Sequence, residues 1–186
     1  MPHEAIVIID VQNAILGPSG TERKAKNHAA LDGVVARIAR LIRHGREQGI
    51  PVLFVQHDGP PGHRLEKASP GWKIRPEISP IEGEPVIHKS ACDSFFETTL
   101  THELQSRGIE RLIVAGCMTQ YCVDTTVRRA VTLGYDVILV ADGHMTADSG
   151  ALGFEQIIDH HNALLDGFDA GSRSVKVLPL DRVLHS

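Results

Sequence analysis

Residues 5–13 read Ala-Ile-Val-Ile-Ile-Asp-Val-Gln-Asn, five apolar residues followed by an aspartate. A short, largely β-branched apolar run that ends at a polar residue is typical of a buried strand. Similar runs follow at residues 52–55, 85–88, 111–115, 136–141 and 174–178. Segments with helical periodicity separate them. This alternation predicts a mostly parallel sheet of about six strands.

The segments between these runs have the pattern of helices that cover a sheet. After the first run, six apolar residues fall on one helical face, and Gly45 and Gly49 then close the segment: Leu31, Val34, Val35, Ile38, Leu41 and Ile42. The same reasoning predicts helices at residues 94–107, 122–133 and 150–165. Helices that connect parallel strands cross over the faces of the sheet. The predicted fold class is therefore α/β, with three layers in the order α/β/α.

The composition of the chain limits the classes of function. With 186 residues and 42% hydrophobic content, it suits a single domain over residues 1–186. Its net charge is -4, and its charged residues form no long run of a single sign, which argues against a nucleic-acid partner. No apolar run reaches membrane-spanning length, and the first residues lack a signal-peptide pattern. The odd number of cysteines, 3, indicates reduced thiols and a cytoplasmic location.

Three reactive side chains follow predicted strands, where open α/β sheets place their sites. Asp10 ends the first run, Lys89 directly follows the third, and Cys122 follows the fourth after a turn. Cys122 is predicted to open a helix, whose free amides and dipole favour a thiolate. The alternatives are a turn former for Asp10, a solvated surface charge for Lys89 and a small core residue for Cys122. Cys92 and Cys117 are interpreted as structural or incidental.

Together the three candidates supply a nucleophile, a base and a cation. A free thiol has a pKa of about 8.5, so a carboxylate that accepts its proton, or an ammonium that stabilises the anion, favours the thiolate. Amides near the predicted helix start would stabilise a developing oxyanion. The pattern predicts nucleophilic catalysis by Cys122.

The motifs around these residues occur in a characteristic order over nearly the whole chain: residues 5–13, 86–89, 116–123 with Thr126, Arg128 and Ala130, and then 134–135 and 140–144. In order and spacing they resemble the isochorismatase-like cysteine hydrolases. That family includes nicotinamidases, carbamoylsarcosine amidohydrolases and ureidoacrylate amidohydrolases. The resemblance implies an isochorismatase-like, Rossmann-like fold.

The resemblance also implies roles for individual residues. Asp10 would be the general base, Lys89 its electrostatic partner and Cys122 the nucleophile. A cis peptide would join Cys117 to Met118, and the amides of Met118 and Cys122 would form the oxyanion hole. The candidates for the substrate pocket are Ile15, His57, Trp72, Thr119 and Tyr121. A solvated loop position is the alternative for His57, and core filling is the alternative for Trp72.

Nicotinamidases of this family bind a divalent ion through an aspartate and histidines after the second strand. Here Asp58 matches the aspartate, but Pro60 stands where a histidine is expected. We therefore expect neither a metal nor another cofactor. His63 is a further candidate to line the pocket, and His144 is interpreted as a structural histidine.

The three candidate residues and the family resemblance predict hydrolysis of a small molecule, by cleavage of a carboxamide or related C–N bond through a thioester on Cys122. One alternative is the vinyl-ether cleavage of isochorismatases, and another is a non-catalytic binding or scaffold protein. The long Pro- and Gly-rich stretch from Gly59 to Pro85 is expected to set specificity. The family resemblance implies a homo-oligomer, a dimer or tetramer. The charge pattern and the absence of a long apolar run predict neither a nucleic-acid nor a membrane partner.

Overall fold

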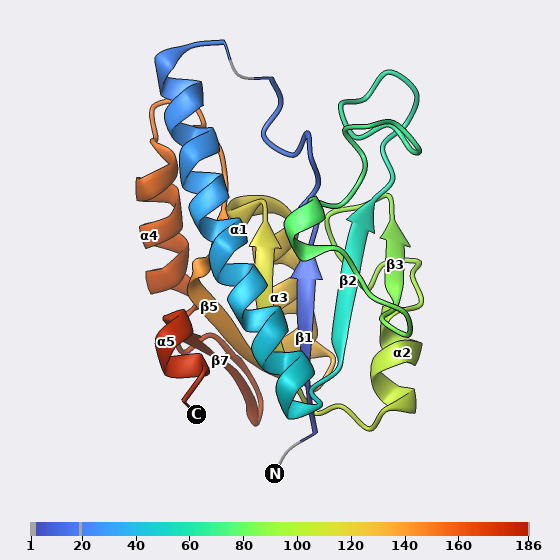
Figure 1. Ribbon diagram of the computed structural model, residues 1–186. Helices are drawn as coiled ribbons and strands as arrows, with labels where there is room; N and C mark the ends of the chain where they lie inside the picture. The colour runs from blue at the N-terminus through green and yellow to red at the C-terminus, as the bar shows by residue number, and fades with distance from the viewer. Residues whose placement is uncertain (1–2, 19, 186) are drawn as a thin grey trace.

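Strand β1 (Glu4–Ile9) is an interior strand of a seven-stranded sheet with the order β3-β2-β1-β4-β5-β7-β6 (Figure 1). The computed structural model describes residues 3–18 and 20–185. The other strands are β2 (Val52–His57), β3 (Val86–Lys89), β4 (Arg111–Cys117), β5 (Asp136–Met145), β6 (Asp169–Ala170) and β7 (Arg173–Leu178). Neighbouring strands pair in parallel, except β6 with β7. The predicted α/β class and mostly parallel sheet are confirmed.

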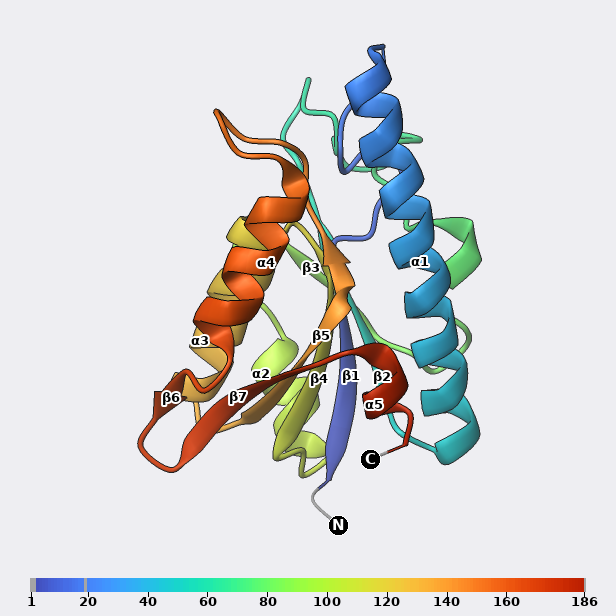
Figure 2. The ribbon, with the colours of Figure 1, turned by 90° about the vertical axis from the view of Figure 1, so that its left-hand side faces the viewer.

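Helices cover both faces of the sheet. Figure 2 shows α1 (Glu22–Gln48) on one side and α2 (Leu100–Ser106), α3 (Asp124–Thr132) and α4 (Phe154–Leu165) on the other. The short α5 (Leu180–Val183) packs on the α1 side. Alternate residues of β1 enter the two cores, with Ile6 and Ile8 in one and Val7 and Ile9 in the other. Burial on both faces explains why β1 is apolar throughout.

Helix α1 extends beyond the apolar stripe that indicated it. The Thr21 side chain caps its start by accepting from the Lys24 amide, and Gly49 ends it with a φ of 70°. Gly45 was expected to close the segment but lies inside the helix. A Cβ at this position would come within 2.4 Å of the Ile6 side chain, so Gly45 allows α1 to approach β1.

Two other helices start later than predicted. Helix α2 begins at Leu100 rather than at residue 94, because side chains bind the backbone in the preceding turn. Asp93 accepts from the Phe95 amide, and Thr98 donates to the Ser94 carbonyl. Residues 150–153 form a turn before α4. Strand β6 was not among the six predicted strands. It has only two residues, too few to show a periodic pattern of apolar and polar side chains.

The predicted helix at residues 122–133 begins with a different structure. Residues Thr119–Val123 form one π-helical turn, and α3 starts at Asp124. Cys122 therefore lies in the turn before α3, a correction to its predicted place at the helix start. Within the described ranges, none of the helices has the length and apolar composition that a membrane crossing requires.

The order of the strands creates a switch point beside β1. The chain leaves β1 for β2 and β3 on one side, and then returns to β4 on the other side. The carboxyl ends of β1 and β4 consequently meet where open α/β sheets bind ligands. Gly116 permits this approach, since its φ is 137° and a Cβ there would lie 2.1 Å from the Ile9 carbonyl oxygen.

Candidate active site

Asp10 and Lys89 meet at the carboxyl edge of the sheet. Asp10 directly follows β1, and Lys89 is the last residue of β3. The Lys89 Nζ lies 2.6 Å from Asp10 Oδ2, and the two side chains are 0% and 1% exposed. Asp10 has a φ of 51°, in the left-handed region that is uncommon for residues other than glycine. The sequence placed both residues at strand ends, and the structure brings them into contact.

The ammonium group of Lys89 is held by more than its ion pair. Its Nζ donates to the Ala91 carbonyl at 2.9 Å and to the Cys92 carbonyl at 3.5 Å. Burial alone would lower the pKa of Lys89, but attraction to Asp10 and to the Cys122 sulfur reverses the shift, so the pKa is raised. Lys89 therefore stays protonated near neutral pH.

Cys122 is the third member of this buried group. Its side chain interacts with both Asp10 and Lys89. Burial raises the pKa of the Cys122 thiol, and the nearby Asp10 carboxylate adds to the shift. Burial also raises the pKa of Asp10, against the opposing effects of Lys89 and Cys122. The raised pKa of Cys122 keeps its sulfur as a thiol at rest, and the Asp10 side chain is placed to accept the thiol proton.

The turn that carries Cys122 has an unusual backbone. The peptide between Cys117 and Met118 is cis, as the family resemblance implied. The Met118 carbonyl then accepts from the amides of Tyr121, at 3.1 Å, and Val123, at 3.2 Å. These bonds order the backbone on both sides of Cys122.

A cavity of about 410 Å³ opens onto the thiol. Its lining includes three of the five predicted pocket residues, Ile15, His57 and Tyr121, and also His63. The other lining residues are Asp10, Arg64, Leu65, Cys92, Met118 and Cys122. The volume suits a small molecule.

Several of these lining residues carried no role in the sequence analysis. Cys92 was interpreted as structural or incidental, yet it is exposed and lines the cavity. Arg64 and Leu65 come from the long loop between β2 and β3, whose length was the only signal that pointed to them. Cys117, in contrast, is buried, as a structural residue would be.

His57 forms part of the cavity wall in its neutral form. Burial lowers the pKa of His57, and the ring lies edge-on to that of His63, with centroids 5.9 Å apart. The His57 Nδ1 is buried and has no hydrogen-bond partner among the described residues.

Thr119 does not line this cavity, which corrects the prediction. Its hydroxyl lies 2.9 Å from Nδ1 of the buried His144, on β5. The Nε2 of His144 lies 2.8 Å from Oδ1 of Asn162, whose Nδ2 donates to the Ala141 carbonyl. Because Oδ1 only accepts, His144 carries its proton on Nε2, and Thr119 donates to Nδ1. This Thr119–His144–Asn162 chain connects the nucleophile turn to α4.

Trp72 also lies outside the lining of this cavity, because its indole is held elsewhere. The Trp72 Nε1 donates to Asp58 Oδ1 at 2.7 Å, and its ring stacks on His88 with a centroid distance of 5.7 Å. Asp58 accepts further bonds from Lys67 Nζ, at 2.6 Å, and His88 Nδ1, at 3.0 Å. Burial raises the pKa of Asp58, but these three bonds outweigh it, and the net pKa is lowered.

These contacts leave Asp58 unsuited to a metal ion. Both of its oxygens already accept from N–H donors, and Pro60 offers no ligand. In the described ranges, no group of three or more His, Cys, Asp or Glu side chains is arranged to hold a metal.

Comparison with known proteins gives a consistent picture. The family model of the isochorismatase domain matches residues 4–165. A streptothricin hydrolase of Streptomyces noursei is 34% identical over 145 residues, which cover 78% of this chain and 50% of the relative. The chain therefore spans about half the length of that relative. A ureidoacrylate amidohydrolase of Variovorax paradoxus is 27% identical over 74% of this chain and 67% of its own.

A solved structure supports the same relationship. The crystal structure of an isochorismatase from Pseudomonas putida KT2440 superposes with a TM-score of 0.83 at 33% identity. The superposition covers 97% of this chain and 89% of the other. The similarity of fold thus extends over almost the whole chain.

Proposed function

The chain belongs to the isochorismatase family and is a hydrolase, and from that premise we propose that it cleaves an amide or related C–N bond of a small molecule through a thioester on Cys122. One observation carries the proposal: the Asp10 carboxylate contacts both the Lys89 ammonium and the Cys122 thiol, at the edge of a cavity of about 410 Å³. The names of the two curated relatives, a hydrolase and an amidohydrolase, support it.

The first half of the reaction forms the thioester. Asp10 accepts the Cys122 proton as the sulfur attacks the substrate carbonyl carbon, and the carbonyl electrons move to oxygen. The raised pKa of Asp10 makes its carboxylate a better proton acceptor than an ordinary aspartate. Lys89 offsets the negative charge shared by the carboxylate and the sulfur.

The second half releases the products. When the tetrahedral intermediate collapses, the C–N bond breaks and protonated Asp10 returns its proton to the leaving amine. Asp10 then takes a proton from water as the water oxygen attacks the thioester carbon. The C–S bond breaks, and Asp10 passes this proton to the leaving sulfur, which restores the Cys122 thiol and the Asp10 carboxylate. In both halves the amides of Met118 and Cys122 are the proposed donors to the oxyanion.

A screen of small amides tests this proposal. Nicotinamide, N-carbamoyl compounds and ureido acids are incubated with the wild type and with Cys122→Ala, and ammonia release is measured. Intact-mass spectrometry of the wild type records any acyl adduct. We expect turnover by the wild type alone, with an adduct at Cys122.

The outcomes separate the alternatives. Turnover that survives in Cys122→Ala would exclude the thioester. If neither protein acts on any amide and Cys122 is alkylated no faster than Cys92, a binding role becomes the better account.

A further inference from the structure

Arg64 brings a guanidinium group to the same cavity as Cys122. It comes from the loop between β2 and β3, and both residues line the cavity. Its Nε donates to the Ile15 carbonyl at 3.1 Å, and its Nη2 donates to the Met118 sulfur at 3.8 Å. Ile15 and Met118 are themselves lining residues, so the exposed side chain is fixed against the cavity rather than free in solvent.

The charge of Arg64 is not neutralised by the protein. Other arginines pair with carboxylates, as Arg46 does with Glu84 at 2.8 Å and Arg75 with Asp32 at 2.9 Å. Within the described ranges, no carboxylate of the chain lies within ion-pair distance of Arg64. Asp10 is the only carboxylate among the described lining residues, and it is paired with Lys89.

The remaining lining adds little charge. Ile15, Leu65 and Met118 are apolar, and burial lowers the pKa of His57 and favours its neutral form. The cavity thus borders the group in which Asp10, Lys89 and Cys122 balance one another, and it also contains a guanidinium without a carboxylate partner. A planar guanidinium binds a carboxylate through two parallel N–H···O bonds.

On this basis we propose that the substrates of this enzyme carry a carboxylate in addition to the scissile amide, and that Arg64 binds that carboxylate. The inference rests on the proposed function and specifies its substrate class as amido or ureido acids. Arg64 orients the acid so that its amide carbon lies near the Cys122 sulfur. Neutral amides of the same shape lack this anchor and react more slowly.

Two matched pairs of compounds test the substrate class. Succinamate is compared with 4-methylpentanamide, and 3-ureidopropionate with N-(3-methylbutyl)urea. In each pair an isopropyl group replaces the carboxylate while the carbonyl group and the spacer stay the same. We expect kcat/KM for ammonia release to be higher for the acid by about 10- to 100-fold, as for a hydrogen bond to a charged group.

Variants of Arg64 connect that preference to the residue. In Arg64→Gln the ratio of kcat/KM for the acid to kcat/KM for its neutral partner should fall by about 10- to 100-fold. Arg64→Lys should retain part of the preference, since it keeps the charge without the bidentate geometry. Arg43→Gln, which removes an exposed arginine of α1 away from the cavity, should behave as the wild type.

A binding measurement separates this inference from the proposed function. Cys122→Ala is titrated with succinamate by calorimetry, with and without Arg64→Gln. Binding that weakens in the double variant supports Arg64 even if turnover is absent. The inference is overturned if the enzyme hydrolyses both members of a pair equally well, or if Arg64→Gln lowers both activities by the same factor. If the enzyme still hydrolyses amides when the Arg64 inference is overturned, the proposed function remains supported.

Discussion

Two ion pairs in this molecule have the same length and opposite surroundings. Lys89 and Asp10 lie 2.6 Å apart with side chains 0% and 1% exposed, whereas Arg23 and Asp148 lie 2.6 Å apart with side chains 42% and 30% exposed. The attraction between two charges depends on the surrounding dielectric as much as on distance. The buried pair therefore loses its hydration, while the charged groups of the exposed pair remain in contact with water. Distance alone does not indicate what an ion pair does.

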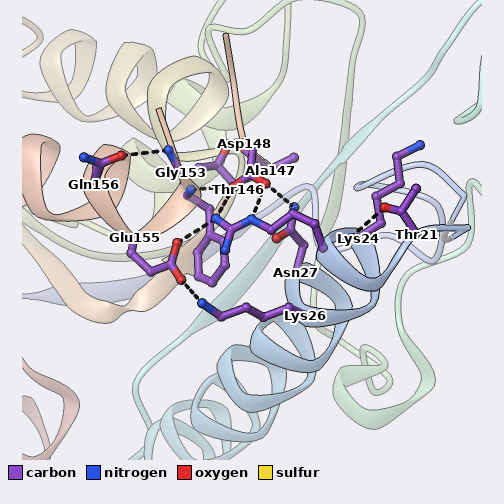
Figure 3. A network of polar contacts seen from close by, with 12 residues as sticks. Thr21, Lys24, Lys26, Asn27, Thr146, Ala147, Asp148, Gly153, Glu155 and Gln156 are labelled. Atoms are coloured by element: carbon purple, nitrogen blue, oxygen red, sulfur yellow. Dashed lines mark hydrogen bonds and ion pairs between the residues drawn. The ribbon is translucent and has the colours of Figure 1, made fainter. Parts of the chain in front are cut away.

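The exposed pair belongs to a network that joins α1 to α4. In Figure 3, Lys26 and Asn27 of α1 face Glu155 of α4 and Asp148, which precedes α4. Asp148 also accepts from the Phe154 amide at 2.8 Å, at the start of α4. The contacts of this network join two helices, and among the described residues none of the cysteines takes part in them.

The largest expected effect comes from breaking the buried pair. Lys89→Met removes the cation and leaves the fully buried Asp10 without its ion-pair partner. We expect a loss of about 3–5 kcal/mol in the free energy of unfolding. Amide turnover should fall by at least about 100-fold. Urea unfolding and the best substrate of the amide screen provide the two measurements.

A double variant serves as the control for that experiment. Asp10→Asn with Lys89→Met removes both charges, so most of the lost stability should return while turnover stays absent. A Lys89→Met protein as stable as the wild type would contradict the view that this pair is buried and mutually dependent. Turnover restored in the double variant would contradict the role of Asp10 as the base.

These elements also show what the sequence could predict. The six longer strands were evident because burial on both faces leaves continuous apolar runs, as in β1. Asp10, Lys89 and Cys122 were found because residues at the carboxyl ends of parallel strands converge. Their pairing distance and the direction of their pKa shifts were not predictable, since both depend on side-chain packing.

Other features had no readable pattern. β6 is too short for a period, and the start of α2 depends on local bonds from Asp93 and Thr98. Arg64 stands in a long irregular loop, where no periodicity relates a side chain to a direction. Trp72 and Thr119 were assigned to the pocket from the resemblance, but Asp58 and His144 bind them elsewhere.

The buried, neutral His144 side chain should have an effect of intermediate size on stability. Burial lowers the pKa of His144 from 6.5 to about 4, and its two nitrogens bond to Thr119 and Asn162. Since the unfolded chain binds the proton more readily, stability from this residue is complete above about pH 6.5. It should decrease by up to about 3 kcal/mol as the pH falls to about 4.

His144→Gln isolates this contribution. A glutamine can keep an acceptor toward Thr119 and a donor toward Asn162, but it does not titrate. The difference in unfolding free energy between wild type and variant should therefore change between pH 6.5 and 4 and be constant above pH 7. Parallel pH profiles for the two proteins would show that His144 is not held neutral in the folded state.

The smallest effect is expected at the exposed pair of equal length. Arg23→Ala removes contacts to Asp148 and Glu155, yet water already solvates these groups, so the urea midpoint should hardly move. Asp148→Ala should cost about 1 kcal/mol in unfolding free energy, because it also removes the acceptor for the first amide of α4.

Raising the salt concentration should reduce the effect of Arg23→Ala and leave that of Lys89→Met unchanged, since salt screens exposed charges far more than buried ones. If Arg23→Ala were as damaging as Lys89→Met, distance rather than burial would govern the strength of these pairs, and the contrast between the two regions would fail.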